Sequence, residues 1–376
     1  MRSVTGWLGS RAVLVALVLG VAAVAGIGAE THPLASGWWW LDRFTYWDSF
    51  HFTRIAEQGY FAAGRSCCDQ SYFPGYPLAI RWVGLVLPGP AALAGFVVSL
   101  GAGAVAAWAM HGLALAEGLT RRAADWAVGL LVVAPFTVFT VAVYSESLWL
   151  AGALLAWWAG RSGRWWLAGT AAALACATRV TGVFLVVGLV VMYAVDARGR
   201  ARRDGGRLLR ADVLFVVPAL LPVVAYMAWL HDRTGSWNAW RQAQSTGWSR
   251  EQVAPWTGLA RQWSHVVHAP DAWLGVTRAI DLLAILAGVL LTALLATRRH
   301  RWPDAAFVGI SVATVLTTTN WDSAGRYSLA WFPAYLVLAN AGERPGWQRV
   351  RLLVTVGSAL LAVLVAVWFG ARHWVG

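Results

Sequence analysis

Acidic residues are rare in this chain, and a few lie where a carboxylate could act on a bound substrate. The sequence has 18 Asp and Glu among 376 residues, and most of them fall beside arginines or at the ends of apolar runs. A carboxylate near a bilayer is costly and usually has a task, for example accepting a proton from a hydroxyl group. The acids that need such an explanation are Asp42, Asp48, Glu57, Asp69, Glu146 and Asp322.

The densest polar stretch is DRFTYWDSFHFTRIAEQGY at 42–60. If residues 48–57 are helical, Asp48 and His51 share one face, because side chains three apart are neighbours on a helix. Either Phe52 or Ile55 completes this face, while Trp47 directly precedes Asp48 and Arg54 follows in the sequence. Asp48 could act as a general base, or it could cap the helix, a structural role worth about 1 kcal/mol. The residues alone leave both roles open.

The next segment is YFPGYPLAIRW at 72–82, which contains Tyr76. Its two prolines and its glycine fix a turn, and an amphipathic stretch then follows the membrane surface. The main role that this pattern predicts is architectural.

Two charged residues are expected at the outer edge of the membrane. Glu146, in YSES at 144–147, stands between two apolar runs and needs a partner. Arg179, in CATRVTG, needs one equally. The two could form a structural pair or a ligand site. NWDSAGRY, which ends at residue 327, adds Asp322 and Arg326 at the same outer surface.

The elements that position these residues are apolar helices. Hydrophobic residues make up 59% of the chain and charged residues 13%, about half the charge of a soluble domain. These proportions exclude a disordered chain and argue against a soluble enzyme. A membrane-spanning helix needs about 20 apolar residues, and the sequence predicts an all-α membrane protein with about 11 of them. The apolar runs are 12–28, 90–117, 124–143, 146–160, 165–178, 181–195, 211–230, 276–297, 304–319, 327–341 and 350–370.

Arginine supplies the entire basic excess of the chain, with 30 Arg and no Lys. Most arginines fall in alternate short loops on the same side as Arg2 and Arg11, and the positive-inside rule therefore predicts a cytoplasmic N-terminus and an outer C-terminus. This topology accounts for the basic charge without nucleic-acid binding. The plasma membrane is the expected location.

Two long outer segments, 29–89 and 231–275, are rich in tryptophan. Most of the 26 Trp fit an aromatic belt at the interface, and some could line a sugar or lipid site. Cys67 and Cys68 are adjacent in the first outer segment, where a vicinal disulfide is possible but strained. Cys176 lies in an apolar run and is expected to pack. The three Cys have no metal-ligand spacing.

The order of the motifs resembles the PIG-V family, which contains the GPI mannosyltransferase II of eukaryotes and bacterial, notably actinobacterial, relatives. The blocks that carry the resemblance cover residues 42–340: WDSFHFTRIAEQGY, YFPGYPL, YSESL, RVTG and RYSLAWFPAYLVLA. The resemblance implies a single membrane domain of GT-C glycosyltransferase fold over residues 1–376. It also implies an active site that faces outward and a polyprenyl-phosphate sugar as donor. The acidic residue that follows Trp in the family's first outer loop matches Asp48.

GT-C chemistry then assigns roles to the candidates. Asp48 would act as base in one inverting displacement, in which a mannosyl residue moves to a lipid-linked or cell-envelope glycan acceptor. A guanidinium fork matches phosphate oxygens, so Arg179 or Arg326 could bind the donor phosphate. No DxD pair occurs in the outer segments, and no metal or other cofactor is indicated. The expected substrate-binding residues are Trp47, His51, Arg54, Tyr76, Glu146, Arg179 and Arg326.

Two other functions compete with the transferase. A transporter or flippase of a lipid-linked sugar would explain many spans without catalysis, but its charges should gather near the middle of the bilayer. Here the charges gather at the outer surface, which favours the enzyme. A non-catalytic partner of another glycosyltransferase is the third hypothesis, and the acid at position 48 argues mildly against it.

Overall fold

The computed structural model describes residues 2–28, 35–61, 68–204 and 208–375. In these residues the chain is helical, and the β structure consists of one isolated bridge between Gln252 and Thr318. The chain forms two compact units, the first made of Met1–Leu154 with Phe332–Val375 and the second of Leu155–Trp331. Helix α7 (Glu146–Arg161) runs across the boundary between them.

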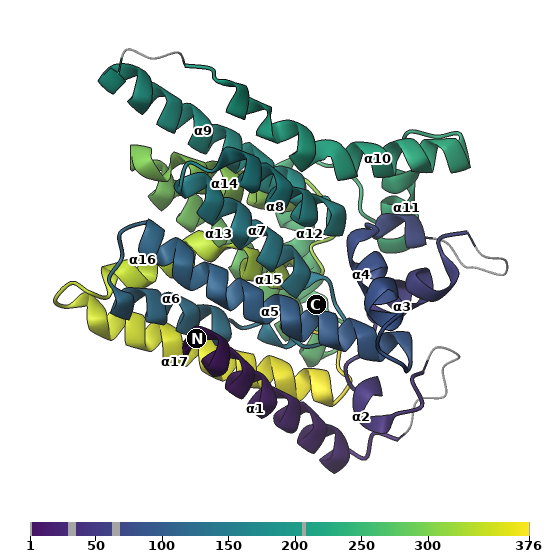
Figure 1. Ribbon diagram of the computed structural model, residues 1–376. Coiled ribbons are helices and arrows are strands. Elements are labelled where there is room, and N and C mark those ends of the chain that lie inside the picture. Colours follow the sequence, from purple (N-terminus) through teal and green to yellow (C-terminus); the bar gives the residue numbers. More distant parts are fainter. Residues whose placement is uncertain (1, 29–34, 62–67, 205–207, 376) are drawn as a thin grey trace. The chain divides into compact units, whose positions relative to one another are not determined.

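In the described residues, the first unit is built on the long helices α1, α5 and α17, with shorter helices around them. Helix α5 packs against α1, α4 and α6, while α17 packs against α1 and α16 against α6 (Figure 1). The elements of this unit are α1 (Arg2–Val24), α2 (Trp39–Asp42), α3 (Ser49–Gln58), η1 (Asp69–Ser71), α4 (Gly75–Gly84), α5 (Ala91–Ala116), α6 (Arg121–Val132), η2 (Thr137–Thr140), α16 (Phe332–Ala341) and α17 (Trp347–Gly370).

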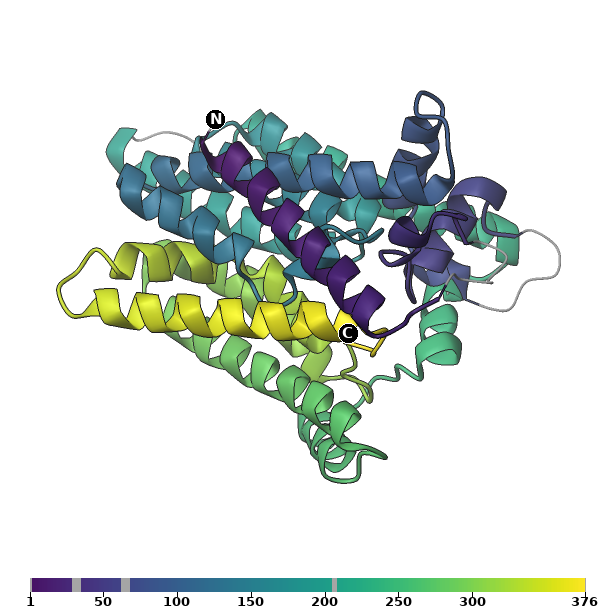
Figure 2. The same cartoon turned by 90° about the horizontal axis from the view of Figure 1, so that it is seen from below.

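Small residues allow these helices to approach closely. A Cβ atom at Gly103 of α5 would lie 2.1 Å from the buried ring of Trp7 on α1. A Cβ atom at Gly370 would lie 2.8 Å from the carbonyl oxygen of Val18. Figure 2 shows how the C-terminal ends of α1 and α17 converge as a result.

The structure corrects the expected course of the first helix. Helix α1 begins at Arg2, so Arg11 lies within it and not in a flanking cytoplasmic segment. The guanidinium of Arg11 is buried and donates to the carbonyl of Val132 at 2.6 Å and to the Thr140 hydroxyl at 2.8 Å. It also donates to the hydroxyl of Thr137. Arg11 therefore fixes the irregular segment that follows α6.

That segment also divides an apolar run that the sequence predicts as one span, 124–143. Helix α6 ends at Val132, and a turn at Pro135 and Phe136 leads into η2. Proline has no N–H to donate and cannot continue a helix, which explains the break.

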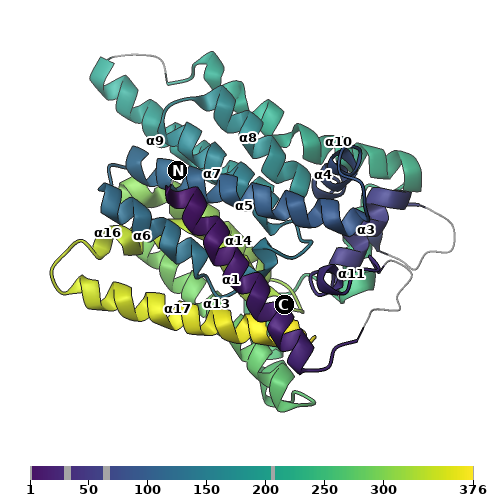
Figure 3. The ribbon, with the colours of Figure 1, turned by 60° about the horizontal axis from the view of Figure 1, so that its bottom comes forward.

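The second unit contains the elements from residue 155 to residue 331. In Figure 3, α8, α9 and α10 lie together, and the contacts of α8 with both α9 and α10 agree with this view. Helices α13 and α14 pack on each other, and α14 also packs on α9. The elements are α8 (Trp165–Thr178), α9 (Gly182–Asp204), η3 (Ala211–Phe215), α10 (Val216–Thr234), α11 (Ala239–Trp248), α12 (Pro255–Val267), α13 (Ala272–Ala296), η4 (Arg299–Arg301), α14 (Trp302–Leu316), α15 (Ala324–Tyr327) and η5 (Ser328–Ala330).

Six helices in the described residues are long and apolar enough to cross a bilayer, and the chain is a membrane protein. They begin at Val4, Ala91, Gly182, Ala211, Ala272 and Trp347. The expected number of about 11 spans is not confirmed, because several of the predicted runs form short or broken helices. The short helices expected in the first outer segment are present as α2, α3 and α4.

Candidate functional site

The chain that leads into α3 is fastened to the helices of the first unit. The amide of Val143 donates to the carbonyl of Phe44 at 2.9 Å, and the hydroxyl of Tyr144 donates to the carbonyl of Tyr46 at 3.0 Å. The rings of Tyr46 and Trp47 each lie 5.4 Å from the ring of Phe369 at the end of α17. The predicted motifs at 42–60 and 144–147 are therefore in contact.

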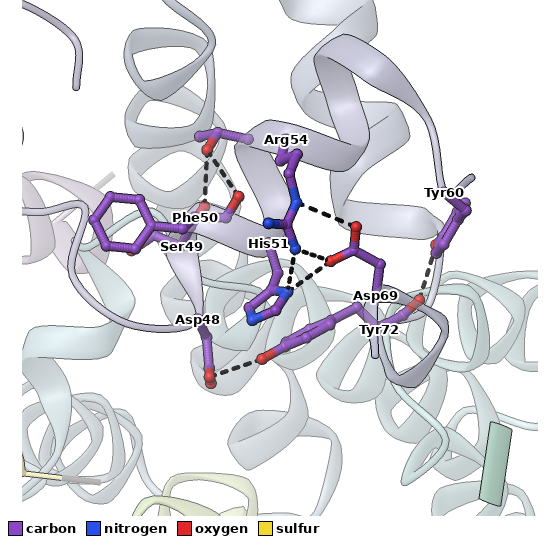
Figure 4. Close-up of polar contacts among 9 residues, drawn as sticks. Asp48, Ser49, Phe50, His51, Arg54, Tyr60, Asp69 and Tyr72 are labelled. Carbon is purple, nitrogen blue, oxygen red and sulfur yellow. Dashed lines mark hydrogen bonds and ion pairs between the residues drawn. The ribbon is translucent and has the colours of Figure 1, made fainter. Parts of the chain in front are cut away.

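Asp48 is half-buried at the start of α3 and does not cap that helix. Its φ and ψ are −57° and −26°, and its side chain makes no capping hydrogen bond. Instead, the Tyr72 hydroxyl donates to its Oδ1 at 2.9 Å (Figure 4). The structure therefore does not support a capping role for Asp48, and its carboxylate faces a side chain from the segment that precedes α4.

Asp69 is the centre of the polar network beside Asp48. Its carboxylate is 2% exposed, and His51 Nδ1 lies 2.7 Å from Oδ1. Arg54 contacts both oxygens, with Nε donating to Oδ2 at 3.2 Å. Burial by itself would raise the pKa of Asp69, but hydrogen bonds and positive charge from His51 and Arg54 outweigh it and lower this pKa.

The charge on Asp69 determines how His51 is held. The Nδ1 atom can donate or accept a hydrogen bond but cannot do both, and an ionised carboxylate only accepts. The Nδ1–H group therefore donates to Asp69. Arg54 Nη2 lies 3.0 Å from Nδ1, but it donates its hydrogen bond to the Asp69 carboxylate and not to the imidazole. The predicted binding residues His51 and Arg54 are thus brought together by Asp69, an acid to which the sequence assigned no role.

Tyr76 and Glu146 are both buried in the first unit. The Tyr76 phenol is fully buried, donates to the carbonyl of Gly95 at 2.9 Å and lies 2.7 Å from the hydroxyl of Ser99. Ser99 in turn donates to the carbonyl of Tyr144 at 3.2 Å. Burial raises the pKa of Tyr76, and the nearby charge of Glu146 adds to the effect. Three motifs therefore meet in the first unit, although a part in substrate binding stays a prediction for both residues.

A second cluster of charges lies in the second unit. The two Nη atoms of Arg250 donate to the hydroxyl of Tyr327 at 3.1 Å and to the carbonyl of Asp322 at 2.9 Å. Arg278 lies 3.9 Å from the carboxylate of Asp322. Burial would raise the pKa of Tyr327, but the positive charges of Arg250, Arg179 and Arg326 lower it. The predicted phosphate ligands, Arg179 and Arg326, therefore share one positive cluster.

Four residues of these clusters had no predicted role: Asp69, Tyr72, Arg250 and Arg278. Tyr72 is the first residue of the YFPGYPL motif and Asp69 lies three residues before it, and this closeness was the available signal. Nothing in the spacing of Arg250 or Arg278 marks them. Cys67 falls outside the described residues, its neighbour Cys68 is disulfide-bonded, and Cys176 is a buried free cysteine.

Comparison with known proteins gives structural similarity only. The sequence matches no protein-family model and no curated relative. The apo oligosaccharyltransferase of Archaeoglobus fulgidus aligns with 98% of this chain and 56% of its own, at 11% identity and a TM-score of 0.47. The A. fulgidus oligosaccharyltransferase AglB, in complex with an inhibitory peptide and a dolichol-phosphate, aligns with 97% of this chain and 55% of its own, at 10% identity and a TM-score of 0.43.

ArnT from Cupriavidus metallidurans, bound to undecaprenyl phosphate, aligns with 99% of this chain and 77% of its own, at 16% identity and a TM-score of 0.41. The chain spans about half the length of the archaeal oligosaccharyltransferases. At these identities and TM-scores the alignments do not assign a function, and the functional argument depends on the residues of the site.

Proposed function

We propose that this membrane protein is a glycosyltransferase of the GT-C type, related to the PIG-V family, that uses a polyprenyl-phosphate sugar as donor. Mannose is the proposed sugar, and the acceptor is a lipid-linked or cell-envelope glycan on the outer face of the plasma membrane. The observation that carries the proposal is the carboxylate of Asp48, which makes no helix cap and is held by Tyr72 beside an ordered His51.

The proposed reaction is one inverting displacement with Asp48 as general base. An acceptor hydroxyl oxygen forms a bond to the anomeric carbon while the bond from that carbon to the phosphate oxygen breaks. The hydroxyl proton passes to the Asp48 carboxylate, and the polyprenyl phosphate leaves with the bonding electron pair. Because a phosphate is already a good leaving group, base catalysis is the step that the protein must supply.

The positive cluster of the second unit has the composition of a phosphate site. The cluster contains Arg179, Arg250 and Arg326, whose positive charges lie near Tyr327. It also contains the acids Asp281 and Asp322. Arg278 adds a further guanidinium beside Asp322. A guanidinium binds phosphate in a bidentate fork, and we assign the donor phosphate to Arg179 and Arg326.

The competing transporter hypothesis draws support from charges inside helices, and Asp281 of α13 is the clearest of these. Asp281 is 1% exposed, and it accepts a hydrogen bond from the amide of Gly325 at 2.6 Å. This bond fastens α15 to α13 and gives the acid a structural role. We therefore retain the transferase as the favoured function.

Transfer in proteoliposomes tests the proposal. Purified protein is supplied with radiolabelled polyprenyl-phosphate-mannose, or the glucose equivalent, and with a glycolipid extract of bacterial envelopes or an alkyl mannoside as acceptor. We expect labelled product whose anomeric configuration is opposite to that of the donor. Movement of donor across the bilayer without transfer would identify a transporter. The absence of both transfer and movement would favour the hypothesis of a non-catalytic partner of another glycosyltransferase.

A further inference from the structure

Tyr72 connects Asp48 to the polar network that is formed by Asp69, His51 and Arg54. Its hydroxyl donates to Asp48 Oδ1 at 2.9 Å. Asp48 directly precedes α3 in the chain, and Tyr72 directly follows η1. Both side chains are half-buried, so the bond is formed where water screens it incompletely. Hydrogen bonds to an ionised acceptor are roughly twice as strong as bonds between neutral groups.

The ring of Tyr72 is held on several sides (Figure 4). It stacks on the imidazole of His51, with ring centres 4.6 Å apart and planes 21° apart. The ring of Phe52 meets it edge-on at 5.0 Å. Because Asp69 in turn fixes His51, the position of the Tyr72 hydroxyl is determined before any substrate binds.

We infer that Tyr72 is a positioning residue for the transfer reaction, and this inference rests on the proposed role of Asp48 as base. The hydroxyl orients the carboxylate for the attack by the acceptor. A base must lie within hydrogen-bond reach of the proton it removes, and a displacement of about 1 Å can cost about 100-fold in rate. Tyr72 acts through Asp48 and not by contact with the reacting atoms.

The chain offers a matched pair of variants to test this role. Tyr72→Phe removes the hydroxyl that reaches Asp48 and keeps the ring that stacks on His51. Tyr60→Phe removes a hydrogen bond of nearly the same length that ends on the backbone carbonyl of Tyr72, and it leaves the ring and the hydroxyl of Tyr72 in place. Both variants should have unfolding temperatures close to each other.

In the proteoliposome assay with polyprenyl-phosphate-mannose, we expect Tyr72→Phe to lower kcat roughly tenfold, equivalent to about 1.4 kcal/mol. The KM for the donor should stay within about twofold, because the lost contact is not made to substrate. Tyr60→Phe should keep kcat within about twofold of the unmutated protein. Equal kcat values for the two variants, or a change confined to KM, would overturn the inference.

The double variant separates this inference from the proposed function. In an Asp48→Asn background there is no anion to position, so Tyr72→Phe should change the residual rate by less than about twofold. A full tenfold loss in that background would mean that Tyr72 acts independently of Asp48. If Asp48→Asn alone leaves transfer intact, the proposed base is wrong. If Asp48→Asn abolishes transfer while Tyr72→Phe behaves like Tyr60→Phe, only the positioning role fails.

Discussion

Replacing Asp48 by Asn tests the proposed base with little disturbance of the fold. Asparagine has the size of aspartate, and its amide oxygen can still accept the hydrogen bond from Tyr72. Asp48 makes no capping bond that the change could break. The net cost to folding is therefore the difference between a charged and a neutral hydrogen bond, about 1 kcal/mol, against a typical total stability of about 5–15 kcal/mol. The variant should fold and insert normally.

The expected effect on the rate is much larger than the effect on folding. A positioned general base contributes about 10²–10⁴-fold, so Asp48→Asn should reduce transfer at least about 100-fold, or about 2.7 kcal/mol of transition-state stabilisation. The loss should appear mainly in kcat, because the proposed donor contacts are made by arginines. The measurement is transfer from radiolabelled polyprenyl-phosphate-mannose at matched protein level.

Glu57→Gln is a suitable control for this experiment. Glu57 is an exposed acid on the same helix, and the same change of carboxylate to amide there should leave the rate within about twofold. Transfer by Asp48→Asn within a fewfold of the unmutated protein would refute the reasoning. The base would then lie elsewhere, with Glu146 the next candidate.

Three further predictions can be checked separately. Reporter fusions should place residues near 60 and 250 outside the cell and those near 200 and 300 inside, and a cytoplasmic residue 60 would rule out the outward site. Arg179→Lys should weaken donor use while the protein still accumulates, because the point charge of lysine cannot replace the bidentate guanidinium fork. If Arg179→Lys and Glu146→Gln both lower only the accumulation of the protein, the two residues have a structural role instead. The pKa of Asp69 is lowered in the folded protein, so its ionised carboxylate stabilises the fold at pH values above the ordinary aspartate pKa of about 3.9. This stabilisation is lost as the pH falls below that value. The difference in unfolding temperature between the unmutated protein and Asp69→Asn should therefore be largest near pH 7 and shrink below about pH 4, whereas a constant difference would contradict this sign.

The sequence predicted the local features of the fold better than its long-range contacts. The apolar runs at 90–117 and 165–178 agree with α5 and α8 to within a residue, because length and composition suffice to define them. The short helices of the first outer segment follow from the FPGYP turn and the amphipathic pattern around it. The run at 124–143 failed because its apolar composition hides the break at Pro135.

The contacts of the site could not be found in the same way. The bond from Tyr72 to Asp48 joins residues 24 positions apart and the pair of Asp69 with Arg54 joins residues 15 apart. No helical or strand period relates such positions. The sequence therefore identified the stretch that holds Asp48, His51 and Arg54, but not the side chains that fix their geometry. The same limit explains why Arg250 and Arg278 were missed.

The backbone turns sharply at Trp47, directly before Asp48. Trp47 has a φ of +52°, a conformation that costs a non-glycine residue of order 1–3 kcal/mol and persists only where its surroundings enforce it. Here the ring of Trp47 packs on Phe369, and the preceding carbonyl of Tyr46 accepts the hydrogen bond from Tyr144. After this turn Asp48 already has helical φ and ψ, whereas a capping residue is normally extended so that its side chain can reach back to the first amides of the helix. At this position the aspartate therefore does not make the common capping bond, and its carboxylate accepts the hydrogen bond from Tyr72 instead.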